Sequence, residues 1–406
     1  MPRRILVYEP EATGHQMELL RYLLDAITQQ VADVWITLLT TTEAAEHPNC
    51  QRLAADFSAA MDIRIAPEVT DRHQLLRFLN PFYERQWQSF QACMRGIAAI
   101  GPDAIDFVLL PHLEAIGLLQ LGMHRNAFAG LPWATITVGA RFHHREAGIS
   151  GPTHWQDRLQ GWFFKLVVAQ PNLVCFGAVN PYLAQTVQHP KVVWCPEPAP
   201  KAELSAPEIA RKAYGLRAET TVVLVFGFIS RRKCVDVLLA SVAALPPDQD
   251  VTIFLAGTQH SGHMRPILDS DAAQQLRARG RLVEENRFIM VGPDIDPMSV
   301  ADICWIFYER NFVYTGNVLV RSAHAGRAVI CRNQGVIGML VNESGCGIAL
   351  DSEDPDIVAA AILRLGGDPE LRDRMGAAGQ RAFAQNTPEA FAQPIVDSIK
   401  TALAAA

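Results

Sequence analysis

Short apolar runs alternate with amphipathic stretches along the whole chain, and this alternation predicts a repeated strand–helix order. In the stretch 16–30, for example, Leu20 and Leu24 fall on one face of a helix. A longer helical stretch, 72–100, should be split or kinked at Pro81, because proline lacks the N–H that a helix needs. The strands predicted in the first half are 4–9, 34–40, 63–66, 107–110, 133–138, 174–176 and 192–194.

A proline-rich segment divides the chain into two halves. Prolines occupy positions 196, 198 and 200, an alternation typical of a linker, so we place a hinge near 195–205. Strands joined by helices form parallel sheets, and the predicted fold class is α/β with two Rossmann-like, doubly wound domains. The strands predicted in the second half are 222–226, 251–255, 288–291, 303–307, 328–331 and 348–350, with helical stretches at 206–214, 318–325, 336–341, 356–365, 369–385 and 388–404.

Composition narrows the class of protein. A chain of 406 residues, 49% hydrophobic and 19% charged, fits a globular protein of two domains. A formal net charge of -6 argues against a nucleic-acid partner. The eight cysteines include no Cys-x-x-Cys pair, which predicts reduced, buried thiols and no zinc site. The charged start of the chain and the lack of a long uncharged apolar run predict a cytoplasmic protein.

Two common ligands, NAD and ATP, are disfavoured because the chain lacks the motifs that usually bind them. Neither 8–14 nor 226–230 contains the Gly-x-Gly-x-x-Gly turn of dinucleotide-binding proteins, and the chain has no Walker lysine motif. The loop 309–316 instead follows an apolar strand and places Gly316 at the start of a helix. Backbone N–H groups and the helix dipole at such a position favour an anion.

Two segments of the second half resemble family 4 glycosyltransferases. The segment 223–239, Val-Leu-Val-Phe-Gly-Phe-Ile-Ser-Arg-Arg-Lys-Cys-Val-Asp-Val-Leu-Leu, resembles the opening of the family's second domain. The segment 323–330, Ala-His-Ala-Gly-Arg-Ala-Val-Ile, resembles the family's Glu-Ala-Met-Ala-x-Gly-x-Pro-Val segment. The resemblance implies the GT-B fold, in which two Rossmann-like domains face each other across a cleft. It also implies metal-independent use of a nucleoside diphosphate sugar, of UDP or GDP type, with retention of anomeric configuration. On this basis we expect an N-terminal domain 1–198, a nucleotide-sugar domain 199–387, and a last helix 388–406 that crosses back to the first domain.

The resemblance also assigns site residues in the second domain. Lys233 matches the family's lysine, which grips the donor diphosphate, and Arg232 lies beside it, while the family's arginine position holds Phe228. Two glutamates of the family, one at the donor sugar and one at the ribose, align with Val313 and Arg321, so both are missing. Glu309 is a substitute for the first glutamate if the loop is shifted. The expected donor-binding residues are Gly227, Arg232, Lys233, Glu309, Thr315, Gly316, Asn317 and Arg321, and Lys233 is also a catalytic candidate.

Histidines supply the candidate chemistry of the first domain. His15 and His112 follow predicted strand ends, which places them on the ligand side of the sheet as catalytic candidates. Each also fits a purely structural role. The pair His143-His144 lies in a polar loop and would either contact the acceptor or be solvated. A metal pair is disfavoured there because no third ligand is nearby in sequence.

Three alternatives remain open at this stage. The apolar stretch 161–168 is either a core helix or a helix at a membrane surface, which would make the protein peripheral to the inner face of a membrane. The missing glutamates are also compatible with a catalytically degenerate subunit that binds a partner. A sugar-nucleotide epimerase has the same fold. The acceptor, whether a sugar, a lipid or a small molecule, is left unidentified.

Overall fold

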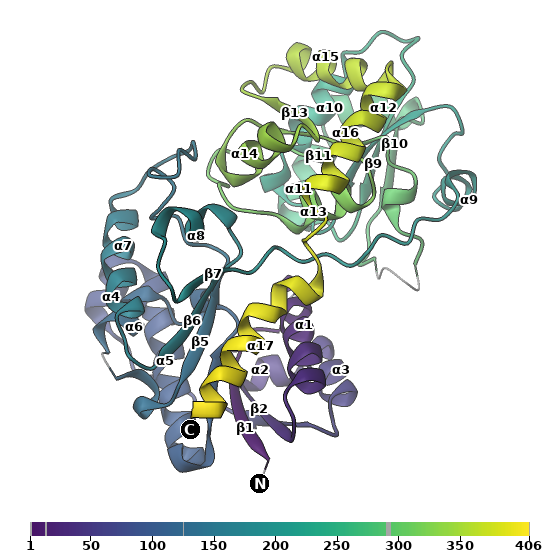
Figure 1. Ribbon diagram of the computed structural model, residues 1–406. Coiled ribbons are helices and arrows are strands. Elements are labelled where there is room, and N and C mark those ends of the chain that lie inside the picture. The colour runs from purple at the N-terminus through teal and green to yellow at the C-terminus, as the bar shows by residue number, and fades with distance from the viewer. Residues whose placement is uncertain (1, 13, 125, 290–293, 406) are drawn as a thin grey trace. The chain divides into compact units, whose positions relative to one another are not determined.

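The computed structural model describes residues 2–12, 14–124, 126–289 and 294–405, and the side chains of His15 and Leu79 lie outside this description. The chain divides into two compact units (Figure 1). Unit 1 consists of Met1–Gly148, Thr153–Pro198 and Pro388–Ala406, and unit 2 of Ile149–Pro152 and Ala199–Thr387.

Unit 1 is built around a seven-stranded sheet with strand order β3-β2-β1-β4-β5-β6-β7, and neighbouring strands are parallel. The register places Ile5 between Ile36 and Phe107 of the two neighbouring strands. The central strands are continuous apolar runs because both faces of the sheet are covered by helices. The strands are β1 (Arg3–Tyr8), β2 (Val34–Thr40), β3 (Met61–Ile65), β4 (Phe107–Leu110), β5 (Trp133–Thr137), β6 (Leu173–Ala178) and β7 (Val192–Trp194).

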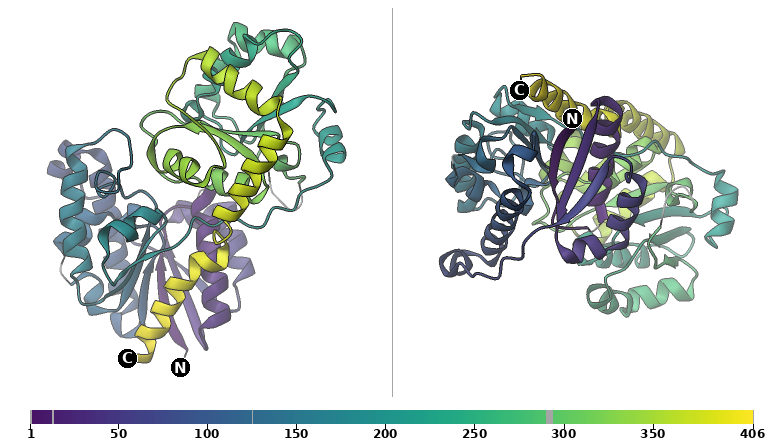
Figure 2. Two further views of the ribbon diagram at one scale, coloured as in Figure 1. Left: turned by 45° about the horizontal axis from the view of Figure 1, so that its top comes forward. Right: turned by 90° about the horizontal axis from the view of Figure 1, so that it is seen from below.

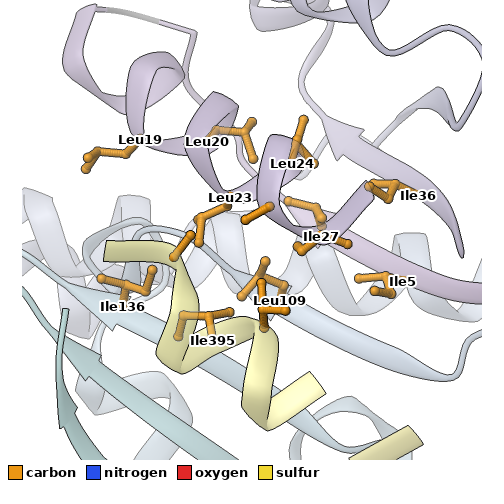
Figure 3. Packing of buried hydrophobic residues seen from close by; sticks show 14 of the residues in the cluster. Ile5, Leu19, Leu20, Leu23, Leu24, Ile27, Ile36, Leu109, Ile136 and Ile395 are labelled. Atoms are coloured by element: carbon orange, nitrogen blue, oxygen red, sulfur yellow. The ribbon is translucent and has the colours of Figure 1, made fainter. Parts of the chain in front are cut away.

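Helices cover both faces of this sheet. They are α1 (Gly14–Gln30), α2 (Thr42–Glu46), α3 (Pro48–Asp56), α4 (Gln74–Leu79), α5 (Pro81–Ile100), α6 (Leu118–Met123), α7 (Trp155–Val168), α8 (Pro181–Val187) and α17 (Pro388–Ala405). One face packs against α1 and α17, where Leu23, Leu109 and Ile395 point into the same buried space (Figure 3). The other face packs against α5, α6, α7 and α8.

Unit 2 repeats this architecture with a six-stranded parallel sheet of order β10-β9-β8-β11-β12-β13. Its strands are β8 (Thr221–Phe226), β9 (Val251–Ala256), β10 (Leu282–Glu285), β11 (Ile303–Ile306), β12 (Ala328–Arg332) and β13 (Gly347–Leu350). Its helices are α9 (Pro207–Ala213), α10 (Val235–Ala243), α11 (Ser261–Leu268), α12 (Asp271–Ala278), α13 (Asn317–His324), α14 (Gly335–Ser344), α15 (Pro355–Gly366) and α16 (Pro369–Ala382). The prediction of an α/β protein with two parallel Rossmann-like sheets is confirmed.

The last helix, α17, belongs to unit 1 although the chain reaches it from unit 2 (Figure 2). It contacts α1 and the strands β4, β5, β6 and β7. The apolar residues spaced along one face of the helix are all buried, namely Phe391, Ile395, Val396, Ile399 and Leu403. Burial of this face explains why an alanine-rich segment forms a stable helix, since packing contributes more than propensity alone.

Pro81 ends one helix and begins another, as predicted from the sequence. Helix α4 stops at Leu79, and α5 starts at Pro81, where the missing N–H of proline costs nothing. The Asn80 side chain caps the new helix by accepting a hydrogen bond from Phe82 N at 2.9 Å.

The strand predicted at 288–291 is wrong in its described part. Phe288 and Ile289 lie in no strand, and positions 290 and 291 are outside the described residues. The strand of this region is β10, an edge strand that ends in Glu284 and Glu285. The two glutamates shorten the apolar run by which a strand is recognised in a sequence. Charged side chains are tolerated there because edge strands commonly carry them.

The apolar helix predicted around 161–168 is α7, and the core interpretation holds for its inner face. Phe163, Phe164, Val167 and Val168 are buried against the sheet of unit 1. Among the described residues, none of the helices combines the length and the apolar character that crossing a bilayer would require.

The packing of α17 gives a testable prediction. Ile395 is completely buried, so Ile395→Ala should lower the free energy of unfolding by about 2–5 kcal/mol through lost burial and a cavity. Lys400 lies on the exposed side of the same helix, and Lys400→Ala should change stability by less than about 0.5 kcal/mol. Urea unfolding followed by circular dichroism measures both. Equal midpoints for the two variants would contradict the role of this helix in the core of unit 1.

Candidate functional site

In both sheets, the strand order reverses direction beside the first strand of the unit. In unit 1, β1 lies between β2 and β4, and in unit 2, β8 lies between β9 and β11. The connections from the two neighbouring strands leave toward opposite faces, so ligands bind at the carboxyl ends of the strands at such switch points. The residues that follow β1 and β4, and those that follow β8 and β11, are therefore the candidates.

A glycine turn follows β8. Gly227 has φ +91, a conformation that side-chain-bearing residues rarely adopt. The adjacent turn after β9 approaches closely, because a Cβ on Gly257 would lie 2.1 Å from the carbonyl oxygen of Gly227. Both turns therefore require glycine. On Gly227 itself, a Cβ would lie 3.9 Å from the amine of Lys233, so this turn borders the predicted phosphate-binding residue.

Lys233 lies inside this turn and not on its surface. The 3-10 turn Arg231–Lys233 carries it, and its side chain is almost fully buried. The amine donates a hydrogen bond to the carbonyl of Phe226 and lies 5.5 Å from the centre of the Tyr308 ring. Burial, with a smaller contribution from the charge of Arg232, lowers the pKa of Lys233 to about 7.

Arg232 contacts the same aromatic group from outside. Its guanidinium lies 5.7 Å from the centre of the Tyr308 ring and 5.2 Å from that of Phe312. Its carbonyl accepts a hydrogen bond from Glu309 N at 2.9 Å, which ties the turn after β8 to the loop after β11. The two adjacent basic residues thus meet at one ring instead of pointing apart, and together they form a cationic group at the β8/β11 switch point.

A third cation at this edge was missed by the sequence analysis. Arg332 ends β12 and is nearly fully buried, and its guanidinium donates to the carbonyl of Tyr308 at 2.7 Å and to the Glu353 carboxylate at 2.6 Å. It also lies 4.3 Å from the centre of the Phe307 ring. Arg332 therefore fixes the backbone that presents Tyr308 to Lys233. A charged residue at the end of an apolar run was the signal that could have identified it.

The loop 309–316 leads into α13 as predicted, but Gly316 has an ordinary conformation. Its φ of -161 and ψ of 124 are extended, and a Cβ there would meet only the flexible end of Ile337 at 3.2 Å. The glycine therefore is not required by the backbone angle. Glu309 is exposed, Thr315 is buried, and Asn317 is the first residue of α13. Their role toward a donor stays a prediction.

Val313 and Arg321, which are predicted to align with the family's two glutamates, are both engaged in the internal structure of unit 2. Val313 is buried, and the Cα of Val313 would lie 2.6 Å from a Cβ on Gly335. Arg321 donates to Asp296 at 3.3 Å and its guanidinium lies 4.5 Å from the centre of the Phe226 ring. Arg321 thus anchors the last residue of β8, and its predicted ribose contact is not tested.

In unit 1, the switch point brings together Glu9 and His112. Glu9 follows β1 and His112 follows β4, and both side chains are buried. The imidazole Nδ1 makes a short hydrogen bond with the Glu9 carboxylate, which is an acceptor when ionised. The other ring nitrogen, Nε2, is buried and has no hydrogen-bond partner in the part of the chain that the structure describes. Sequence reasoning singled out His112 but missed Glu9, because Glu9 was assigned to the strand.

His15 can be placed only by its backbone. It is in the first turn of α1, directly after the loop that follows β1, and its side chain lies outside the described residues. Its catalytic role therefore stays a prediction.

The prediction of a polar loop at 143–144 is corrected. Both histidines are buried, and His143 Nε2 lies 2.9 Å from Asn180 Nδ2. Burial, followed by the charge of His144, lowers the pKa of His143 to about 3. Burial, followed by Arg141, lowers the pKa of His144 to about 4. Both rings are therefore neutral near pH 7, and they lie in the protein interior and not in solvent.

Glu114 has a structural role at the carboxyl end of β5. One of its carboxylate oxygens accepts hydrogen bonds from Thr137 Oγ1 at 2.7 Å, Val138 N at 3.0 Å and Gly139 N at 2.7 Å. It thus caps β5 and gives the loop after it a fixed start. Within the described ranges, no group of three His, Cys, Asp or Glu side chains is arranged to hold a metal ion.

No family model matches the chain. In sequence it is similar to the D-inositol 3-phosphate glycosyltransferase of Corynebacterium kroppenstedtii, 30% identical over 179 residues, which are 42% of this chain and 38% of that protein. The enzyme of the same name from Thermobifida fusca is 28% identical over 180 residues, 41% of this chain and 39% of that protein. The chain thus matches about two fifths of the length of these curated relatives.

Solved structures match over the whole chain. The sucrose-phosphate synthase of Thermosynechococcus elongatus superimposes with a TM-score of 0.70 at 16% identity and covers 100% of both chains. WaaG, a glycosyltransferase involved in lipopolysaccharide biosynthesis, has a TM-score of 0.66 at 13% identity and covers 97% of this chain and 99% of that one. Anabaena HepE, solved in complex with UDP-glucose, has a TM-score of 0.65 at 13% identity and covers 98% and 99%. The chain therefore has the GT-B fold, and its sequence is similar to that of family 4 glycosyltransferases.

Proposed function

We propose that the protein is a glycosyltransferase that moves a hexosyl group from a nucleoside diphosphate sugar, of UDP or GDP type, to an acceptor with retention of anomeric configuration. Two findings support this proposal. The curated relatives are glycosyltransferases, and a structural neighbour was solved with UDP-glucose. The acceptor, a sugar, a lipid or a small molecule, is not specified by these findings.

The observation that carries the proposal is the uncompensated positive charge at the β8/β11 switch point. Neither Lys233 nor Arg232 forms an ion pair with an acidic side chain of the described residues, and no carboxylate contributes to the lowered pKa of Lys233. Burying an amine without an anion is costly, so its retention indicates a ligand that supplies the negative charge. A diphosphate at the strand ends fits this requirement.

This arrangement can stabilise the leaving group. When the bond between the anomeric carbon and the diphosphate oxygen breaks, negative charge develops on the phosphate. In this proposal, Lys233, Arg232 and the start of α13 supply the positive potential that stabilises this charge, which is electrostatic catalysis of the leaving group.

The Glu9–His112 pair of unit 1 would contact the donor sugar or the acceptor. In the tautomer that donates its Nδ1–H to Glu9, the Nε2 atom of His112 is left as an acceptor. We assign Nε2 a hydrogen bond from a hydroxyl of the donor sugar or of the acceptor, and we assign Glu9 the positioning of the ring.

A degenerate subunit is the second candidate, favoured by a specific observation. On the predicted alignment, Val313 and Arg321 take the positions of the two glutamates, and each is engaged inside unit 2. A protein of this kind would bind the donor or a partner without turnover. The epimerase alternative rests on a likeness of fold alone, and no complete set of proton donors and acceptors can be named among the described residues.

The first test removes charge from the donor site. A charge-assisted contact contributes roughly 1.5–3 kcal/mol, so Lys233→Ala should weaken binding of UDP or GDP about ten- to a hundredfold. Lys212, an exposed lysine of α9, supplies the matched control Lys212→Ala, which should bind as wild type does. Gly316→Asp should weaken binding more than the neutral, equally large Gly316→Asn. Calorimetric titration measures all four. If wild type binds UDP or GDP and Lys233→Ala binds it equally well, the diphosphate lies elsewhere, and if wild type binds neither at millimolar concentration, the degenerate subunit is the better account.

The lowered pKa of Lys233 gives a prediction about pH. Free Lys233 loses its proton as pH rises through about 7, whereas a bound diphosphate stabilises the charged amine and raises its pKa. Binding should therefore take up a proton near pH 7, and affinity should fall as pH increases from about 6.5 to about 8.5. Titrations in two buffers with different ionisation enthalpies measure the proton uptake. The linkage should disappear in Lys233→Ala, and an unchanged uptake in that variant would assign it to another group.

The Glu9–His112 pair is tested by turnover. Glu9→Gln and His112→Asn should each lower the transfer rate by about a hundredfold, a typical contribution of a positioned acid–base group, with little change in UDP or GDP affinity. If Glu9 acts through His112, the double variant should be no slower than His112→Asn alone. Multiplicative losses in the double variant would show that the two residues act independently.

A further inference from the structure

The outward face of α7 is unusual for a soluble helix. Its inner residues Phe164 and Val167 are buried, whereas Trp155 is 66% exposed and Trp162 55% exposed. Tryptophan is a residue that proteins normally bury for most of its surface. Two of them exposed on one helix call for an explanation other than packing within unit 1.

Basic residues alternate with these tryptophans. Trp155, Arg158, Trp162 and Lys165 follow one another at intervals of three, four and three residues, and all four are exposed. This spacing places them in a single stripe along the helix. The one acidic residue of α7, Asp157, is outside the stripe.

A second group of exposed apolar side chains lies at the corner between α4 and α5. Phe78 is 87% exposed and Phe82 43% exposed, and Leu75 of the same corner is exposed as well. The Arg85 guanidinium lies 5.8 Å from the centre of the Phe82 ring, so a basic group again accompanies the aromatic one.

The corner and the stripe belong to the same side of unit 1. Helix α4 contacts α5, α5 contacts α6, and α6 contacts α7, and Figure 1 shows α4, α6 and α7 along one side of the unit. Burial and then the Asp157 carboxylate raise the pKa of Tyr83, so the start of α5 is near the start of α7. We name this surface the aromatic–basic face and define it by Phe78, Phe82, Trp155, Arg158, Trp162 and Lys165.

We propose that the aromatic–basic face docks on the surface of a membrane that contains anionic phospholipids. Tryptophan is stabilised at the level of the lipid headgroups because its apolar ring carries a polar N–H, and phenylalanine buries its apolar ring at the same boundary. Arginine and lysine between them meet the negative surface charge. This surface is separate from the donor site proposed in unit 2, and it does not depend on that function.

The local charge fits an anionic partner although the whole chain carries a net charge of -6. Acidic residues close to the face are already engaged. Asp157 accepts two hydrogen bonds from Arg141, each of 3.1 Å, and Asp71 is paired with Arg95 at 2.9 Å. Arg158 and Lys165 have no such partner among the described residues. The face is therefore positive in a protein that is otherwise negative.

A second copy of this chain is a poorer occupant of the face. An isologous dimer would bring the stripe of one copy against the same stripe of the other, and Arg158 and Lys165 would then meet like charges. An anionic bilayer instead offers opposite charge along the whole stripe.

Vesicle co-sedimentation tests the proposal. Wild type should pellet with phosphatidylcholine vesicles that contain phosphatidylglycerol and much less with phosphatidylcholine alone. Raising the salt from about 0.1 to about 1 M should reduce binding, because screening shortens the reach of the charges. Trp155→Ala/Trp162→Ala should weaken partitioning at least about tenfold. Arg158→Gln/Lys165→Gln should lose about fivefold per charge, and only on the anionic vesicles.

Matched controls come from unit 2. Phe288 is 67% exposed, so Phe288→Ala removes an equally exposed aromatic side chain outside the face. Arg265→Gln/Arg279→Gln removes the same amount of charge from exposed positions. Both controls should pellet as wild type does. The proposal is overturned if wild type does not bind anionic vesicles, or if the tryptophan variant binds them as wild type does. A wild type that dimerises in sedimentation velocity, with dimerisation lost in the tryptophan variant, would overturn it in favour of a second copy.

Discussion

Parallel pairing of the strands is the constraint on which the rest of this structure depends. In both sheets, the named strands pair only in parallel, so all their carboxyl ends lie along one edge of the sheet. Residues far apart in sequence are brought together there by topology, as Glu9 and His112 are across 103 positions. The strand order then selects one point on each edge, beside β1 and beside β8, where connections diverge. Glu9 and His112 lie at the first of these points, and Lys233 and Arg232 at the second.

On the proposed function, a charged Lys233 is needed to bind the diphosphate, but burying that charge lowers the stability of the folded protein. Its amine ionises with a pKa of about 7 in the folded protein and near the ordinary lysine value when unfolded. The unfolded chain therefore binds more protons between these values, and stability rises as pH increases from about 7 to about 10. The hydrogen bond to the Phe226 carbonyl and the Tyr308 ring offset part of the cost of charge, since a desolvated cation–π contact contributes about 2 kcal/mol. Arg332 is the third part of this arrangement, because it fixes Tyr308 by its carbonyl.

The sequence predicted what depends on local pattern and missed what depends on distant contacts. Continuous apolar runs gave the central strands, and Pro81 gave the break between α4 and α5, because sterics and burial act within a few residues. Lys233 could be placed next to the turn after β8 because a strand-end glycine precedes it by a few positions, and its role toward a donor stays a prediction. Glu9 and Arg332 end apolar strands and were included in them or passed over, since their partners lie elsewhere in the chain. The buried His143 contacts Asn180, which is 37 positions away in the sequence, so no local pattern indicates this contact.

The two switch points differ in the partners of their titratable side chains. In unit 1, Glu9 and His112 are hydrogen-bonded to each other. In unit 2, the guanidinium of Arg321 is neutralised by Asp296 and stacked on Phe226, while Lys233 and Arg232 are not neutralised. Arg321 thus supports the strand end from which the Lys233 turn begins. On the predicted alignment, Arg321 lies where the family has a glutamate, so an acceptor for ribose hydroxyls is missing while the charge predicted to bind phosphate, that of Lys233 and Arg232, is present. On the proposed function, the diphosphate then contributes more of the donor affinity than the nucleoside does.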